Sequence, residues 1–155
     1  MEHSLYFPLF VDLSGQKILV VGAGSIASRR AHSLLPFTKN ITVVAPNVHP
    51  ALETLADEGK VTLLRRTYEP EDVDTADLVL VATDDHQLNC QIAARCKALR
   101  IPVNVCDDPN ACDFFFPGIA RKGDLVIGVT AGGTDHKAVK AVTEELRRYI
   151  QEQIE

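Results

Sequence analysis

A short glycine-rich segment, Gly22-Ala23-Gly24-Ser25-Ile26-Ala27, carries the clearest chemical signal in the sequence. It has the G-x-G-x-x-A spacing of a dinucleotide-binding fingerprint, in which Gly22 permits a tight turn and Gly24 lets a pyrophosphate approach the backbone. Amides at the start of the following helix then bind the pyrophosphate. A glycine turn that binds no ligand is the alternative. Because the segment stands between a predicted strand and a predicted helix, we favour a dinucleotide site.

The position that usually anchors the ribose of such a cofactor is not acidic here. In dinucleotide-binding folds an Asp or Glu about 20 residues after the glycines binds the ribose hydroxyls. The corresponding positions read Val44-Ala45-Pro46-Asn47, with no acid and no Arg for a 2′-phosphate. Asn47 can bond a ribose hydroxyl as a neutral partner, so we expect NAD rather than NADP. An ordinary loop asparagine is the alternative.

Polar side chains also stand at the ends of two further predicted strands. Thr83-Asp84-Asp85 follows one of them, and Asn104 and Asp107-Asp108 surround the end of the other. Ligands of open α/β sheets bind beyond the carboxyl ends of the strands, so these residues are expected to face the same crevice. For the first group the alternative is that one of its two aspartates caps the following helix. For Asp107 we favour a functional role.

Five short runs rich in Val, Ile and Leu alternate with helix candidates. The predicted strands are Lys17–Val21, Ile41–Ala45, Val61–Leu64, Leu78–Ala82 and Val103–Val105. Continuous apolar runs are typical of parallel strands that are buried on both faces. Apolar positions at helical spacing predict helices from about Ile26 to Leu35 and from about Leu88 to Leu99. The sequence therefore predicts an α/β fold with a Rossmann-like, doubly wound parallel sheet.

The pattern changes after Asp107. Phe114–Arg121 and Leu125–Thr130 flank Lys122-Gly123-Asp124, which predicts a hairpin, and a helix is predicted from about Lys137 to Ile154. We expect residues 1–113 to form a cofactor-binding domain and residues 114–155 to form a small hairpin-plus-helix dimerisation segment. A symmetric homodimer would cover the apolar side chains at 114–116.

Composition narrows the classes of partner. The chain has 155 residues, of which 46% are hydrophobic and 24% charged, which is typical of one globular domain. Its net charge is −5 with no basic block, so neither nucleic acid nor an anionic membrane is an expected partner. Met1–Phe10 lacks an apolar stretch of signal-peptide length, and the other apolar runs fall far below the roughly 20 residues of a membrane span. A cytoplasmic protein is expected.

The cysteines are expected to be reduced thiols that bind no metal. The chain contains four of them without a C-x-x-C pair. The spacing of the conceivable metal ligands fits no compact site; these are Cys106, Asp107, Cys112 and His136.

Together, these motifs resemble the precorrin-2 dehydrogenase family, which forms the N-terminal module of siroheme synthase. The resemblance is most specific at Asn104-Val105-Cys106-Asp107-Asp108 and the following Phe116-Pro117. Other matching stretches extend it through nearly the whole chain: Tyr6–Gly15, Val20–Ala27, Val43–Pro46, Ala82–Asp85, Leu88-Asn89, Cys112–Phe114 and Gly132-Gly133. It implies NAD-dependent oxidation of precorrin-2, a polycarboxylated tetrapyrrole, to sirohydrochlorin.

The resemblance also assigns residues. Asp107 matches the aspartate with the central catalytic role, and the positions of Ser25, Ile26, Pro46 and Asn47 match cofactor contacts. The predicted cofactor-binding set is therefore Gly22, Ala23, Gly24, Ser25, Ile26, Pro46, Asn47, Thr83 and Asp84. We expect Asp107 to accept a proton, with its pKa raised by burial against a flat apolar ligand. The nearest cations for substrate carboxylates are Arg121, Lys122, Lys137 and Lys140.

One loop departs from the family pattern. The family commonly has a hydroxyl residue before the paired glycines and Ser-Pro soon after them, whereas this chain has Ala131 and Thr134-Asp135-His136. The sequence ends at Glu155, and we expect the family's further helical domain to be absent. Two alternatives remain, namely a non-catalytic NAD- or tetrapyrrole-binding sensor and a sirohydrochlorin ferrochelatase. Because a chelatase needs a closed, preorganised cavity, we expect iron insertion by this chain alone to be weak or absent.

Overall fold

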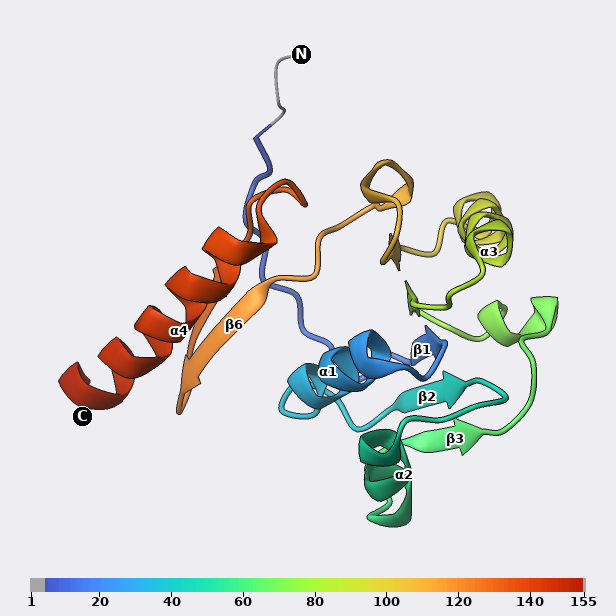
Figure 1. Cartoon of the computed structure of the whole chain (residues 1–155), viewed down its shortest axis with the longest axis horizontal. Coiled ribbons are helices and arrows are strands. Elements are labelled where there is room, and N and C mark those ends of the chain that lie inside the picture. The colour runs from blue at the N-terminus through green and yellow to red at the C-terminus, as the bar shows by residue number, and fades with distance from the viewer. Residues whose placement is uncertain (1–4, 155) are drawn as a thin grey trace. The chain divides into compact units, whose positions relative to one another are not determined.

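The described part of the chain, residues 5–154 of a computed structural model, divides into two compact units (Figure 1). Val11–Phe114 forms the first unit, and residues 5–10 and 115–154 form the second. The boundary after Phe114 lies next to the expected division, whereas residues 5–10, which we expected in the first domain, group with the second unit. The first four residues of the expected domain 1–113 and the last of the expected segment 114–155 lie outside the described residues.

The first unit contains a five-stranded parallel sheet in the order β3-β2-β1-β4-β5. Its strands are β1 (Ile18–Val21), β2 (Ile41–Val44), β3 (Thr62–Leu64), β4 (Leu78–Val81) and β5 (Val103–Val105). The central strand β1 pairs on both sides, so that Ile18 lies opposite Ile41 and opposite Leu78. This order, with both neighbours of β1 reached through crossovers, confirms the doubly wound prediction.

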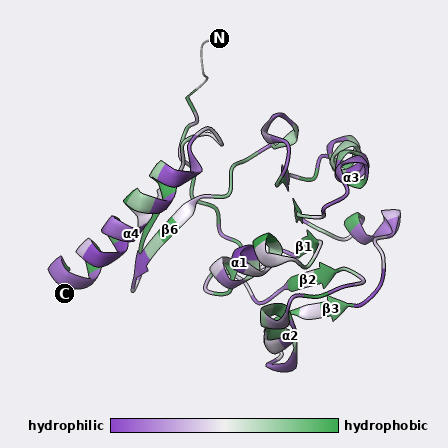
Figure 2. Ribbon diagram, viewed as in Figure 1, coloured by the Kyte–Doolittle hydropathy of each residue, from purple (hydrophilic) through white to green (hydrophobic). Residues whose placement is uncertain are grey.

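The hydrophobic core of the first unit lies on its strands. All four residues of β1 are buried, and the last three of β4 are completely buried. Figure 2 shows β1 and β2 as hydrophobic segments between mixed helices. Side chains of successive strand residues point to opposite faces, so a run that is buried throughout must be covered on both faces. That burial keeps the strands, and the loops at their ends, in place.

Each helix of the first unit follows a strand and has an identifiable start. The helices are α1 (Ser25–Leu34), α2 (Pro50–Asp57) and α3 (His86–Leu99), with 3₁₀ turns at Pro70–Val73 and Pro109–Ala111. Helix α3 begins where the Asp85 carboxylate accepts a hydrogen bond from the amide of Leu88. Helix α2, which we did not predict, begins with Pro50 after the His49 ring has accepted from the amide of Ala51. It has only eight residues, too few for a clear apolar period.

Helix α3 ends at an arginine in a left-handed conformation, which predicts a stabilising substitution. Arg100 has φ 59° and ψ 34°, a region that costs a residue with a Cβ roughly 1–2 kcal/mol. Glycine avoids this cost but loses about 0.4–1 kcal/mol through the entropy of its unfolded chain. Arg100→Gly is therefore expected to raise the free energy of unfolding by up to about 1 kcal/mol in urea titrations. Lys97→Gly, in the last turn, should instead lower it by roughly 1 kcal/mol.

The second unit is a hairpin packed against one long helix. Strands β6 (Gly118–Lys122) and β7 (Leu125–Val129) pair antiparallel, and α4 (His136–Gln153) packs against β6. The hairpin was expected to begin at Phe114, but β6 begins only after Pro117, which has no N–H to donate to the ladder. In the segment before it, the edge of the Tyr6 ring meets the ring of Phe115, with 4.6 Å between centroids.

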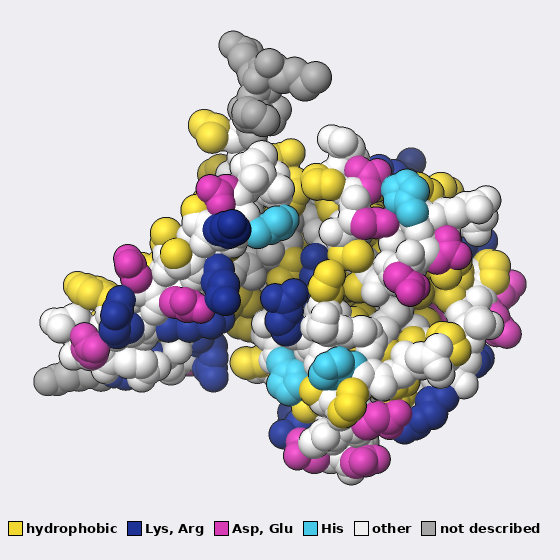
Figure 3. All heavy atoms as spheres, in the orientation of Figure 1, with side chains coloured by type: hydrophobic (Ala, Val, Ile, Leu, Met, Phe, Trp, Pro, Cys, Tyr) yellow, Lys and Arg dark blue, Asp and Glu magenta, His cyan; other side chains and the backbone are white. Residues whose placement is uncertain are grey.

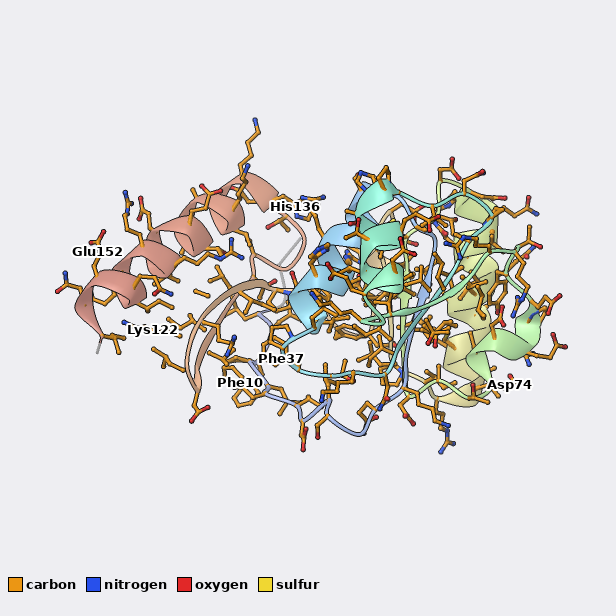
Figure 4. The ribbon with its side chains drawn as sticks, turned by 90° about the horizontal axis from the view of Figure 1, so that it is seen from below. Phe10, Phe37, Asp74, Lys122, His136 and Glu152 are labelled. Atoms are coloured by element: carbon orange, nitrogen blue, oxygen red, sulfur yellow. The ribbon has the colours of Figure 1, made fainter. Side chains whose placement is uncertain are left out.

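Hydrogen bonds tie the second half of α4 to the hairpin. Arg147 Nε donates to the carbonyl of Ile119 at 2.8 Å, and Lys122 Nζ donates to the carbonyl of Gln151 at 3.3 Å. Figure 4 shows Lys122 beside the last turns of α4 and His136 at its first turn. A lysine at these carbonyls stabilises the negative end of the helix dipole. None of the helices in residues 5–154 combines the length and the apolar character that crossing a membrane requires.

Candidate functional site

The glycine loop leaves the central strand in a conformation that only glycine adopts easily. Gly22 has φ 101°, and its amide donates to the carbonyl of Val44 at 3.0 Å. A Cβ at Gly22 would overlap the Ala82 carbonyl group, lying 2.6 Å from its carbon. The loop after β1 therefore passes directly against the end of β4. The tight turn assigned to Gly22 from the sequence is present for this physical reason.

The start of α1 fits a bound anion. Gly24 is the N-cap of this helix, no side chain caps its amides, and its first turn contains no acidic residue. A Cβ at Gly24 would meet no atom within 4 Å, so the backbone there faces open space. Ser25 and Ile26, the next two residues, are exposed. The uncapped amides and the positive end of the helix dipole are what a pyrophosphate binds.

The loop after β2 lies against the glycine loop. The amide of His49 donates to the carbonyl of Ala23 at 2.8 Å, which joins the two loops at the carboxyl edge of the sheet. Pro46 and Asn47 stand between β2 and this contact, and both are exposed. The structure thus brings the predicted ribose-side residues next to the predicted pyrophosphate site.

The loop after β4 is held by a network around a buried amide. Asn89 Nδ2 donates to the carbonyl of Thr83 at 3.1 Å, and the Thr83 hydroxyl donates to Asn89 Oδ1. Asp85, and not Asp84, caps α3, which resolves the capping alternative for this pair. Asp84 is exposed at the same edge of the sheet.

The Asp107 carboxylate, after β5, contacts the first residue of α3. Its Oδ2 lies 3.0 Å from Nδ1 of His86. Partial burial is the largest single influence and raises the pKa of Asp107, but hydrogen bonds from His86, Asn89 and the backbone together outweigh it and lower that pKa. In the protein alone the pKa of Asp107 is thus lowered, whereas the rise expected when a flat apolar ligand covers the carboxylate stays a prediction. The same hydrogen bond and the charge of Asp107 raise the pKa of His86.

A half-buried arginine of α1, Arg30, holds the side chain of Asn104 in β5. Arg30 Nη1 donates to Oδ1 of the buried Asn104 at 2.5 Å, and Asn104 Nδ2 donates to the carbonyl of Phe114 at 2.8 Å. Burial lowers the pKa of Arg30 and raises the pKa of Cys106 and of Cys112. The two hydrogen bonds fix the side-chain amide of Asn104, the middle residue of β5, in one orientation.

Sequence reasoning missed three of these residues. His86, Asn89 and Arg30 contact the predicted site from helices, at separations of up to 74 positions in the chain. Two of them had a local signal, because His86 immediately follows the Asp84-Asp85 pair and Asn89 belongs to the matching stretch Leu88-Asn89. Conversely, Arg121 and Lys122, predicted as substrate cations, donate to backbone carbonyls of their own unit, namely those of Gly123 and Gln151.

Comparison with known proteins identifies the family to which the chain belongs. A family model described as "Putative NAD(P)-binding" matches residues 9–118. The chain is 43% identical to a siroheme synthase of Pseudoalteromonas atlantica over 150 residues, which are 97% of this chain and 31% of that protein. It is 41% identical to a siroheme synthase of Pseudomonas entomophila, covering 94% of this chain and 31% of the relative.

A solved structure is similar along nearly the whole chain. This structure, named "SirC, precorrin-2 dehydrogenase", matches with a TM-score of 0.80 and 27% identity, over 94% of this chain and 76% of that one. The chain itself spans 31% of the length of the two siroheme synthases. The resemblance inferred from the motifs is confirmed. The chain therefore belongs to the "Putative NAD(P)-binding" family, within the group that contains siroheme synthases and precorrin-2 dehydrogenase.

Proposed function

We propose that this chain catalyses the NAD-dependent dehydrogenation of precorrin-2 to sirohydrochlorin. The observation that carries the proposal is the meeting, at one sheet edge, of an uncapped helix N-terminus after β1 and the Asp107 carboxylate after β5. Only strand β4 lies between β1 and β5, so a cofactor at the end of β1 and a proton acceptor after β5 can face the same substrate. The names of the relatives, siroheme synthase and precorrin-2 dehydrogenase, support this substrate.

The cofactor-binding residues are proposed as predicted. The amides of Ser25 and Ile26 bind the pyrophosphate, with Gly22, Ala23 and Gly24 leaving room for it, and Asn47 and Pro46 face the ribose. Thr83 and Asp84 flank the cofactor from the end of β4. Positions 44–47 contain no cation for a 2′-phosphate, which favours NAD over NADP.

Dehydrogenation removes a hydride and a proton from precorrin-2. NAD supplies the hydride acceptor when it is bound. In the protein, Asp107 accepts the proton, and its lowered pKa keeps the carboxylate ionised and ready to do so. Arg30 holds Asn104, and with it the end of β5 that carries Asp107, in a fixed geometry.

An anaerobic assay tests the proposal. Precorrin-2 generated enzymatically is mixed with NAD and the protein, and NADH is followed by absorbance. Catalysed NADH formation supports a dehydrogenase, whereas saturable NAD and tetrapyrrole binding without turnover would make the chain a sensor. A parallel incubation of sirohydrochlorin with ferrous iron is expected to show little siroheme formation above the spontaneous rate. Strong catalysis there would establish the ferrochelatase alternative.

We also propose a homodimer formed by the second unit. The exposed face of α4 has a groove of about 370 Å³ lined by both charges and apolar side chains: Val142, Glu145, Leu146, Arg148, Tyr149 and Glu152. Figure 3 shows blue and magenta side chains with yellow ones between them along this helix. A surface with both charge signs around apolar residues supports this proposal, because a two-fold interface pairs the same patch on both subunits and needs groups of both signs. A cytoplasmic location is also proposed, because all four cysteines are free thiols, as is usual in reducing compartments.

A charge in the groove should weaken this dimer. Tyr149 is 59% exposed, and Tyr149→Glu would place a carboxylate in the buried interface. We expect a dissociation constant at least about tenfold higher, which corresponds to roughly 1.4 kcal/mol, measured by sedimentation or light scattering. Lys140→Glu, a charge change on the opposite side of α4, is the matched control. A monomer in the unmodified protein, or equal effects of both substitutions, would contradict the arrangement.

A further inference from the structure

The contact between His86 and Asp107 suggests a role beyond structure. We propose that His86 is a positioning residue, whose Nδ1–H holds one oxygen of the Asp107 carboxylate so that the other oxygen receives the proton of the substrate. This inference rests on the proposed dehydrogenase function. It assigns a purpose to a histidine at the edge of the sheet that neither the glycine loop nor the cofactor residues require.

The geometry fixes both ring nitrogens of His86. Nδ1 lies 3.0 Å from Oδ2 of Asp107, and Nε2 lies 3.5 Å from Sγ of Cys90, one helical turn further along α3. An ionised carboxylate accepts only, so Nδ1 carries the hydrogen, and in the neutral ring Nε2 then accepts from the Cys90 thiol. The ring is therefore oriented from both sides, although its side chain is 68% exposed.

The helix start holds His86 in place. The Asp85 carboxylate caps α3, and His86 is the first residue of the helix, so its backbone is fixed next to the loop after β5. Asn89, buried one turn later, also contacts Asp107. Two side chains of α3 thus orient the carboxylate, and of these only His86 can carry a positive charge.

The charges around the pair explain why a histidine matters here. From α3, the Asp85 carboxylate faces His86, and from the loop after β5, Asp108 does so too. Cys106, at the end of β5, interacts with Asp107 and with Arg30. Neighbouring acids disfavour ionisation of a carboxyl group, whereas a hydrogen-bond donor to the carboxylate favours it. With His86 removed, Asp107 keeps its acidic neighbours and loses its principal donor, so its pKa should rise.

The experiment compares three variants of the full chain with the unmodified protein. His86→Ala removes both the hydrogen bond and the charge, whereas His86→Asn retains an N–H near the position of Nδ1 but cannot be protonated. Gln87→Ala, at an exposed neighbouring position on α3, is the matched control. The pH dependence of NADH formation is measured together with NAD affinity and thermal unfolding.

The ionisation state of Asp107 determines in which direction the pH profile should shift. Only the ionised carboxylate accepts a proton, so activity is lost as the pH falls through the pKa of Asp107. His86→Ala should move this acid limb to higher pH and leave NAD affinity unchanged. His86→Asn should restore part of the shift, and Gln87→Ala should show none. An unmoved acid limb in His86→Ala, with the protein folded and turnover intact, would overturn the proposal.

A second measurement separates this inference from the proposed activity. The carboxyl carbon of Asp107 is titrated by NMR in the unmodified protein and in His86→Ala, without any substrate. A higher titration midpoint in the variant supports the positioning role even if precorrin-2 proves not to be the substrate. Equal midpoints would refute it, whatever the outcome of the activity assay.

Discussion

Gly24→Asp is expected to abolish NAD binding while leaving the protein at least as stable as before. Gly24 is the uncapped N-cap of α1, and a side chain there meets no atom within 4 Å. Aspartate is a preferred N-cap, so its carboxylate should bond the free amides and interact favourably with the helix dipole. Those amides are the ones we assign to the pyrophosphate, whose charge the carboxylate would repel.

The two effects are measured separately. Calorimetry should detect no NAD binding to Gly24→Asp, and thermal unfolding should show an unchanged or slightly higher midpoint, because a cap of this kind contributes a few tenths of a kcal/mol over glycine. Gly24→Ala adds a side chain without charge or capping oxygen and should weaken binding less. Undiminished NAD affinity in Gly24→Asp would remove the glycine loop as the cofactor site.

Asp107→Asn should lower turnover roughly 10²–10⁴-fold, the usual contribution of a general base. Asparagine has the shape of the carboxylate but cannot accept the substrate proton. The substitution keeps an oxygen that can accept from His86, whose Nδ1 lies 3.0 Å from the carboxylate, so the loop should retain its conformation. Single-turnover measurements of NADH formation would therefore show a slower chemical step.

Asp108→Asn is the matched control for this substitution. Asp108 accepts from the amide of Asn110 and starts the short turn after β5, and asparagine caps as well as aspartate does. We expect near-normal turnover in Asp108→Asn and normal NAD affinity in both variants. Near-normal turnover in Asp107→Asn would show that another group takes the proton.

The sheet could be predicted closely because its signal is local. Strands β1, β4 and β5 are short apolar runs that are largely buried. Each of the five predicted strands overlaps an observed one, with differences of at most one residue at either end. Errors arose where local signals are weak. Helix α2 is too short for a hydrophobic period, and the start of β6 depends on the missing N–H of Pro117. Residues 5–10 join the second unit through contacts far apart in sequence, which no window of sequence reveals.

In the candidate site, too, the part with a local sequence signal could be predicted and the part formed by distant residues could not. The glycine loop lies within six consecutive residues, and its strand–turn–helix setting makes its chemistry legible from sequence. The partners of Asp107 and Asn104 could not be predicted from sequence, because His86 and Arg30 reach them from two separate helices. The pKa of Asp107 is lowered by hydrogen bonds from side chains of α3, so the direction of this shift could be determined only from the structure.

The division of the chain into its two units has a consequence for synthesis. Val11–Phe114 is one uninterrupted stretch, so every residue of the first unit has been synthesised before α4 is made. The second unit combines residues 5–10 with α4 and cannot be completed until α4 has been synthesised. Until then Tyr6 lacks the ring of Phe115 that it meets in the second unit. The exposed apolar side chains beside it, those of Leu5, Phe7 and Leu9, are a typical source of aggregation in nascent chains.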